Sequence, residues 1–257
     1  MQKIEQKLAE LNGMKKYPDT LYSSGNEALL QRKKVSIIGS RKTSKYTREL
    51  THKLATSLKN VGVCVVSGGA MGVDAVAHLG AGSNNTIAVL PCGINIKYPA
   101  VNKNLLNDIE KNGLLLSQFE PDFRATPWSF VVRNELVVAL GEVLVVAEAE
   151  LGSGSMRSIE FALKMGKEIF VFPHRVGESN ATNELLKENK AKAIYDIDLF
   201  VTRFGKQQKK QEISDDFLLF CQTTPTYDEA LVKFPERVFE AELSGEIEIR
   251  NGRVFLI

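Results

Sequence analysis

The feature that most constrains the fold is an alternation, across residues 35–195, of short apolar runs and longer amphipathic stretches. The apolar runs are rich in β-branched residues, which is typical of strands buried on both faces of a sheet. They cover Val35–Gly39, Val63–Ser67, Thr86–Leu90, Leu114–Gln118, Val143–Ala147 and Ile169–Phe172. The amphipathic stretches have helical spacing and cover Ser44–Asn60, Val73–Ala81, Asn102–Lys111, Trp128–Leu140 and Ser155–Met165. Strands that alternate with helices predict a doubly wound, mostly parallel sheet of the Rossmann-like α/β class.

The chain divides into four segments by composition and pattern. Residues 1–34 are expected to form a short N-terminal helical lead-in, and residues 35–204 the Rossmann-like domain. Residues 205–214 are charged, rich in glutamine and without aromatic residues, so we expect a linker. Residues 215–257 predict a small winged-helix-like module, with helices at Asp216–Gln222, Tyr227–Phe234 and Arg237–Leu243 and a hairpin around Asn251-Gly252.

Composition excludes several classes of protein. The 33 basic and 31 acidic residues give a net charge of +2, so anion binding has to come from local clusters of charge. Cys64, Cys92 and Cys221 form no CxxC pair and, with three histidines in the chain, predict no metal site and a reduced, cytoplasmic protein. The start of the chain has no apolar core of a signal peptide, and no apolar run reaches the roughly 18 residues that span a bilayer. We therefore expect no membrane association.

The first predicted strand ends in Gly39, Ser40 and Arg41, which is the first candidate for an anion site. A turn at this point places a hydroxyl and a guanidinium at the carboxyl edge of the sheet, where open α/β folds bind ligands. Arginine suits phosphate because its planar fork donates two hydrogen bonds. By itself the tripeptide also fits a surface arginine after an ordinary turn.

The second predicted strand runs into a glycine-rich turn that contains Ser67, Gly68, Gly69 and Gly72. Without Cβ atoms, such a turn lets a phosphate approach the backbone amides. The spacing matches neither a Walker loop nor GxGxxG, so no nucleotide cofactor is expected. Asp74 and His78 follow on one helical face, where helix capping and a buried hydrogen bond are favoured over acid–base or metal chemistry. Cys92, in the loop after the third strand, is interpreted as structural for want of a nearby activating group.

Two further segments carry candidate DNA contacts. Trp128 and Phe130 stand beside Arg133 and Asn134, a combination suited to stacking bases and holding phosphates of a single strand. Helical spacing also suits a core position, which we favour for Phe130. For Trp128 the core and a surface contact are about equally expected. After the fifth strand, a turn of small residues opens a helix whose amides could bind another phosphate, although two glutamates precede it. Its candidate residues are Ser153, Gly154 and Ser155.

Taken in order, the segments GSR, SGGAMGVDAVAH, TIAVLPCGINIKYPAVN, RNELV, VVAEAELGSGS and IFVFPHRVGESNATNELL resemble the DNA-processing protein A (DprA/Smf) family over residues 15–200. The resemblance implies a protein of natural transformation that protects incoming single-stranded DNA, forms a homodimer and helps to load the RecA recombinase, without catalysis. By position, it assigns DNA binding to Ser40 and Arg41, to the three glycines 68, 69 and 72, to Arg133 and Asn134, and to the Ser153–Ser155 turn.

Two other functions stay open. The first is a nucleotide phosphoribohydrolase of the lysine-decarboxylase-like group, whose PGGxGTxxE signature is faintly echoed by Gly152–Ser155 with Glu160. The second is a transcriptional regulator whose winged helix reads duplex DNA. Its candidate recognition helix, Arg237–Leu243, carries two glutamates and one arginine, which suits a protein partner better than a phosphate-lined groove.

Overall fold

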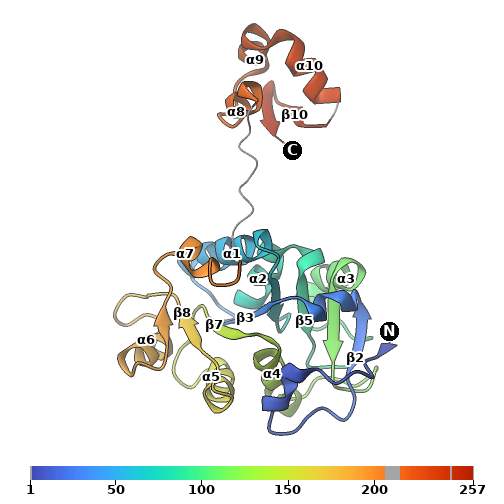
Figure 1. The fold of residues 1–257 in the computed structure, drawn as a ribbon, viewed down its shortest axis with the longest axis vertical. Helices are drawn as coiled ribbons and strands as arrows, with labels where there is room; N and C mark the ends of the chain where they lie inside the picture. Colours follow the sequence, from blue (N-terminus) through green and yellow to red (C-terminus); the bar gives the residue numbers. More distant parts are fainter. Residues whose placement is uncertain (1, 206–214, 244, 257) are drawn as a thin grey trace. The chain divides into compact units, whose positions relative to one another are not determined.

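The computed structural model describes residues 2–205, 215–243 and 245–256. The chain forms two compact units, Met1–Gln207 and Gln208–Ile257, which are described separately (Figure 1). Within the described ranges, no helix has both the length and the apolar character needed to cross a membrane.

The first unit is built on a nine-stranded sheet with the order β1-β2-β6-β5-β4-β3-β7-β8-β9. In this order, the neighbouring strands β6, β5, β4, β3, β7, β8 and β9 are all parallel. β2 pairs antiparallel with both β1 and β6. This arrangement confirms the predicted doubly wound, mostly parallel α/β fold. The strands are β1 (Gln2–Lys3), β2 (Tyr22–Gly25), β3 (Lys34–Ile38), β4 (Cys64–Ser67), β5 (Thr86–Val89), β6 (Leu114–Ser117), β7 (Val143–Val146), β8 (Ile169–Val171) and β9 (Lys192–Ala193).

Helices cover both faces of this sheet (Figure 1). On one face lie α1 (Lys45–Asn60), α2 (Val73–Ala81), α3 (Lys103–Asn112) and α7 (Ile197–Val201). On the other lie α4 (Pro127–Leu140), α5 (Ser155–Lys164) and α6 (Asn180–Lys187). All residues of β3 to β8 are buried, as expected for strands packed on both sides. The chain crosses from β6 back to β7 beside β3, so a topological switch point lies between β3 and β7.

Local capping explains where the helices begin. The Ser44 hydroxyl accepts the amide of Thr47 at the start of α1, and Thr126 and Ser129 cap each other's backbone amides at the start of α4. Pro127 occupies the first position of α4, where no backbone donor is needed. These sequence signals set the helix starts within a residue or two of the predicted bounds.

The expectation of a separate helical lead-in at residues 1–34 is wrong. Besides the short 3-10 helices η1 (Ala9–Gly13) and η2 (Glu27–Gln31), this segment contributes β1 and β2 to the sheet. Leu11 and Leu29 are fully buried in the same core cluster as α4 and α5. Because the segment buries apolar side chains and completes one edge of the sheet, it belongs to the first unit.

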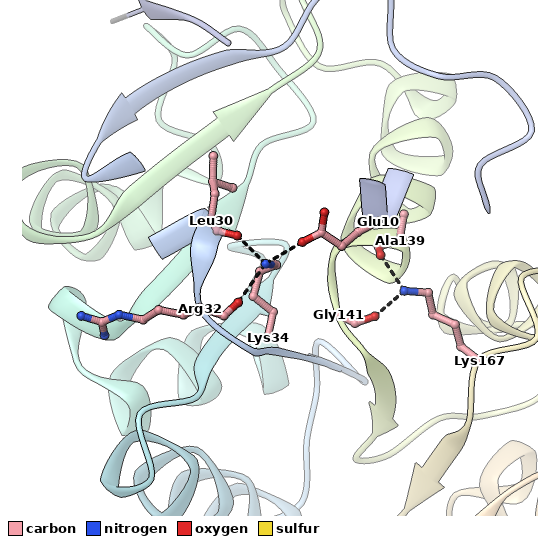
Figure 2. A network of polar contacts seen from close by, with 7 residues as sticks. All are labelled: Glu10, Leu30, Arg32, Lys34, Ala139, Gly141 and Lys167. Carbon is pink, nitrogen blue, oxygen red and sulfur yellow. Dashed lines mark hydrogen bonds and ion pairs between the residues drawn. The ribbon is translucent and has the colours of Figure 1, made fainter. Parts of the chain in front are cut away.

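Two lysines, the buried Lys34 and the half-buried Lys167, donate to backbone carbonyl oxygens of the first unit (Figure 2). Lys34 donates to the carbonyl oxygens of Leu30 and Arg32, at 2.6 and 2.9 Å, and pairs with Glu10 at 2.8 Å. Lys167, after α5, donates to the carbonyl oxygens of Ala139 and Gly141 at the end of α4. Each ammonium is thus supplied with acceptors, as a buried charge requires.

The second unit contains the three helices and the hairpin that the sequence indicates. They are α8 (Asp216–Cys221), α9 (Tyr227–Lys233), α10 (Pro235–Leu243), β10 (Ile247–Arg250) and β11 (Arg253–Leu256). Asn251 and Gly252 both have positive φ, at 48° and 72°, as a two-residue hairpin turn requires. The unit has its own core around Phe217 and Val238. The expected linker lies outside the described residues except for Gly205, and the winged-helix assignment stays a prediction.

Candidate nucleic-acid interface

A cavity of about 560 Å³ lies at the carboxyl edge of the sheet, beside the switch point between β3 and β7. Its walls come from the turns after β3, β4 and β7 and from α4 and α5. Nine of the twelve predicted site residues line it: Gly39, Ser40, Arg41, Gly68, Arg133, Asn134, Ser153, Gly154 and Ser155. The remaining three, Ser67, Gly69 and Gly72, do not line this cavity. The fold therefore brings together four segments that are far apart in the sequence.

The turn after β3 is fixed by its own polar groups. The Ser40 hydroxyl accepts the amide of Lys42 at 3.1 Å and donates to the Lys42 carbonyl at 2.9 Å. The Ser40 amide and carbonyl bond to Glu148 and Val73, at 2.8 and 3.1 Å. These bonds hold the backbone while the Arg41 side chain stays exposed at the cavity. A guanidinium held there is suited to binding an anion.

The three residues outside the cavity shape the turn after β4. The Ser67 hydroxyl donates to the Ile37 carbonyl at 2.6 Å and is fully buried. Gly69 and Gly72 have φ of +67° and +75°, and a Cβ on Gly72 would overlap the carbonyl oxygen of Ser40. Glycine is required because side chains rarely adopt this backbone conformation and because the two turns touch.

The carboxylate of Asp74 accepts hydrogen bonds from two backbone amides of the glycine turn. Its Oδ2 atom accepts the amides of Gly68 and Ala70 at 3.2 and 3.3 Å. Burial raises the pKa of this carboxyl, while the Arg133 charge and these hydrogen bonds act in the opposite direction. Two amides that were expected to bind a phosphate are thus already bonded within the protein.

Arg133 is buried, with 4% of its surface exposed. Its Nη1 atom donates to the carbonyl oxygens of Gly68 and Val89, the latter at 2.7 Å, and its Nε donates to the Asn134 side chain at 3.1 Å. Burial lowers the pKa of Arg133, and the carboxylate of Asp74 opposes that effect. Arg133 thus links α4 to the ends of β4 and β5.

The turn after β7 presents small residues to the cavity. The Ser153 hydroxyl is buried and has no hydrogen-bond partner within the part of the chain that is described. The two glutamates before this turn accept hydrogen bonds from other segments, and Glu150 also lines the cavity. Glu148 accepts from the amide and hydroxyl of Ser44 at the start of α1, and Glu150 accepts from the amides of Ser179 and Asn180 at the start of α6. Their charges therefore stabilise two helix N-termini.

Further residues line the cavity, among them Lys42 and Arg157, which were not predicted, and Phe130, which was considered for base stacking but favoured for the core. The ring centroid of Phe130 lies 5.4 Å from the Arg41 guanidinium and 5.9 Å from that of Arg133. The core position favoured for Phe130 is wrong, because its ring is only half-buried and forms a cavity wall. Trp128 is 62% exposed. Basic residues flanking the GSR and SGS turns were the signal that could have found Lys42 and Arg157.

The residues set aside as structural are indeed buried. His78 is fully buried and its Nδ1 lies 2.7 Å from the Thr86 hydroxyl. The Cys92 thiol lies 3.2 Å from the Ile96 carbonyl, and burial raises its pKa, which disfavours a thiolate. Among the residues with described positions, no group of acidic, histidine and cysteine side chains could hold a metal ion.

Comparison with known proteins gives consistent matches. The family model for DNA recombination-mediator protein A matches residues 5–205. The DNA processing protein DprA of Streptococcus pneumoniae is 35% identical over 175 residues, which cover 66% of this chain and 62% of that protein. That of Bacillus subtilis is 30% identical over 182 residues, covering 69% and 61%. The chain therefore matches about three fifths of the length of these relatives.

Solved structures of this kind are also similar. A DNA processing protein A from Helicobacter pylori, described for its unique single-stranded DNA binding mode, is 39% identical with a TM-score of 0.77, over 79% of this chain and 94% of that one. The S. pneumoniae DprA structure is 32% identical with a TM-score of 0.72, over 77% and 71%. With the family model matched across the sheet and the cavity, this chain belongs to the DNA recombination-mediator protein A family, DprA/Smf.

Proposed function

We propose that this protein binds single-stranded DNA in the cavity beside β3 and β7, and that it neither forms nor breaks covalent bonds in the DNA. The observation that carries the proposal is the exposed Arg41 guanidinium at a cavity that is also lined by the basic side chains of Lys42 and Arg157 and by several small residues. Its volume of about 560 Å³ is within the usual range for ligand sites. The H. pylori relative, which was described for single-stranded DNA binding, supports the same ligand.

In this proposal, Arg41 binds a phosphate of the strand with two hydrogen bonds. The next phosphate of the DNA backbone lies against Ser153–Ser155 at the start of α5. These residues are small, so no bulky side chain keeps the phosphate from the backbone amides there. Phe130, at the wall, and Trp128, which is exposed, offer flat surfaces for bases. Contacts made mainly to phosphate tolerate many sequences and weaken as salt rises.

Arg41→Ala tests the proposal directly. Fluorescence anisotropy of a labelled oligonucleotide at several salt concentrations gives the affinity and its salt dependence. We expect weaker binding and a log–log salt slope smaller by about 0.7, because one phosphate of the single strand is no longer neutralised. Lys53→Gln, an exposed charge change on α1 away from the cavity lining, is the matched control and should bind like the parent. Parent-like binding by Arg41→Ala at all salt concentrations would rule out this cavity.

We further propose that the protein acts in natural transformation as a homodimer that helps to load RecA, as the family resemblance implies. Two copies on one strand would raise the effective concentration of each cavity for the DNA. Light scattering should report a dimer, and RecA filament formation on a coated oligonucleotide should be faster with the protein than without it. A monomer at high concentration, or no effect on RecA, would overturn the corresponding part of the proposal.

The two alternative functions have less support. Glu160, the carboxylate required for N-glycosidic cleavage, pairs with Arg157 at 2.9 Å and is not among the described residues that line the cavity. In the second unit, Arg237 of α10 pairs with Asp215 and Glu246, so its charge is already neutralised. We propose that this acidic unit binds protein, and sequence-specific duplex binding would contradict that view.

A further inference from the structure

We propose that Arg133 and Asp74 are a pair of positioning residues, which set the shape of the DNA cavity without themselves holding a phosphate. The inference rests on the proposed function. It departs from the assignment of Arg133 to the DNA contacts, and it gives an acidic residue in an anion-binding cavity a role that favours binding.

Arg133 directs its hydrogen-bonding capacity into the protein. Its guanidinium donates to the end of β4 through Gly68 and to the end of β5 through Val89. Both acceptors are backbone carbonyl oxygens, and only 4% of the arginine surface is exposed. A phosphate that took these donors would leave two buried carbonyl groups unbonded, which is unfavourable.

Asp74 and Arg133 meet at Gly68. A Cβ on Gly68 would lie 2.8 Å from Asp74 Oδ2 and would overlap the guanidinium of Arg133. One residue therefore presents its carbonyl oxygen to the arginine and its amide to the aspartate. Each charge acts on the other across Gly68, because the Arg133 charge favours the ionised Asp74 and the Asp74 carboxylate favours the charged Arg133.

Helix α4 connects the pair to the exposed cation. Arg133 lies one helical turn after Phe130 on α4, and the Phe130 ring lies 5.4 Å from the Arg41 guanidinium. By fixing α4 against β4 and β5, Arg133 fixes the ring against which Arg41 rests. Asp74 meanwhile fixes Gly68 and Ala70, which also line the cavity. Loss of either charge should therefore displace the cavity walls.

Asp74→Asn gives the sharper test, because a simple charge effect and a positioning role predict opposite changes in DNA affinity. If charge alone decided binding, removal of a carboxylate from the cavity would strengthen the binding of an anionic strand. We expect binding to weaken by about tenfold instead, because Arg133 loses its counter-charge and the Gly68–Ala70 amides lose a strong acceptor. Equal or tighter binding of the oligonucleotide by Asp74→Asn would overturn the inference.

Arg133→Met separates positioning from direct binding of the strand. We expect about tenfold weaker binding with the salt slope of the parent, since every neutralised phosphate stays neutralised. A slope smaller by about 0.7, as expected for Arg41→Ala, would show that Arg133 holds a phosphate and would refute the pair. Circular dichroism and thermal unfolding establish whether the variants are folded.

If Arg133→Met does not fold, Arg133→Gln is the second test. Glutamine removes the charge but keeps an amide group that can donate to a carbonyl oxygen. Weaker binding with the salt slope of the parent supports positioning, and a slope smaller by about 0.7 contradicts it. The parent chain is titrated first in the same buffers. Failure of the parent to bind the oligonucleotide would refute the proposed function, and the inference with it, whereas failure of the variant outcomes alone would refute only the inference.

Discussion

At the scale of single residues, Gly72 lies where the turn after β4 contacts the turn after β3. It has φ of +75°, and a Cβ there would overlap the Ser40 and Arg41 carbonyl oxygens. We expect Gly72→Ala to lower the free energy of unfolding by more than the roughly 1–2 kcal/mol typical of unfavourable φ alone, and to weaken DNA binding. Gly62, with φ of +77° and open space around it, is the matched control. Equal losses of stability in Gly72→Ala and Gly62→Ala, by urea unfolding, would show that the two turns do not constrain each other.

His78 makes stability depend on pH. Burial disfavours its charged form and lowers its pKa from the ordinary value of 6.5 to about 3, and the Arg133 charge acts in the same direction. Between these values the unfolded chain binds more protons than the folded chain, so stability is lost as pH falls below 6.5. We expect a contribution of about 1.4 kcal/mol to be lost by pH 5.5. Urea unfolding at pH 7.5 and 5.5 measures it.

The controls for this pH dependence are two histidine substitutions. His78→Gln should reduce the stability difference between the two pH values, whereas substitution of the exposed His52 by Gln should leave it unchanged. If His78→Gln retains the full pH dependence of the parent, another group is responsible.

At the scale of residues, the sequence could predict which turns lie together, but not which side chains are buried or which groups they bond. The positions of Ser40, Arg41 and Ser153 could be predicted because strand ends in a parallel sheet share one edge. The burial of Arg133 could not, because its partners Gly68 and Val89 are backbone groups of distant segments. A pattern of residue types carries no information about a carbonyl oxygen that the fold brings near.

At the scale of elements, six strands and five helices of the first unit were predicted within a residue or two of their bounds. Their patterns are strong because the strands are buried on both faces. β2 was missed because its sequence, YSSG, has no apolar run, and its place in the sheet depends on antiparallel pairing with β6. β1 and β9, with two residues each, are too short to show a period.

The junction between α4 and the segment after α5 depends on Lys167. Methionine at this position keeps the length of the side chain but removes the donors for the Ala139 and Gly141 carbonyl oxygens (Figure 2). We expect Lys167→Met to lower the free energy of unfolding by about 1–3 kcal/mol, because both carbonyl oxygens lose their hydrogen-bond donor. Lys164→Met, an exposed position on α5, should change stability little. Thermal unfolding of the two variants makes the comparison, and equal transitions would show that these hydrogen bonds are not needed.

At the scale of the whole molecule, charge is unevenly divided along the chain. Residues 215–257 contain nine acidic and four basic residues, so this part of the second unit has a net charge of −5 although the whole chain has +2. We therefore expect a chain shortened to residues 1–205 to bind single-stranded DNA at least as tightly as the parent, with the same salt slope. A loss of affinity greater than tenfold in the anisotropy titration would show that the second unit contributes DNA contacts.

The outermost strands of the sheet, β1 and β9, have only two residues each, whereas the central strands have three to five. Such a tapering sheet leaves little backbone at either margin for a foreign strand to hydrogen-bond with. Growth by edge-to-edge addition, the route by which open sheets form aggregates, is thereby discouraged. In the proposed homodimer, we therefore expect the contact between copies to use side-chain surfaces, which substitution can alter without disturbing the sheet.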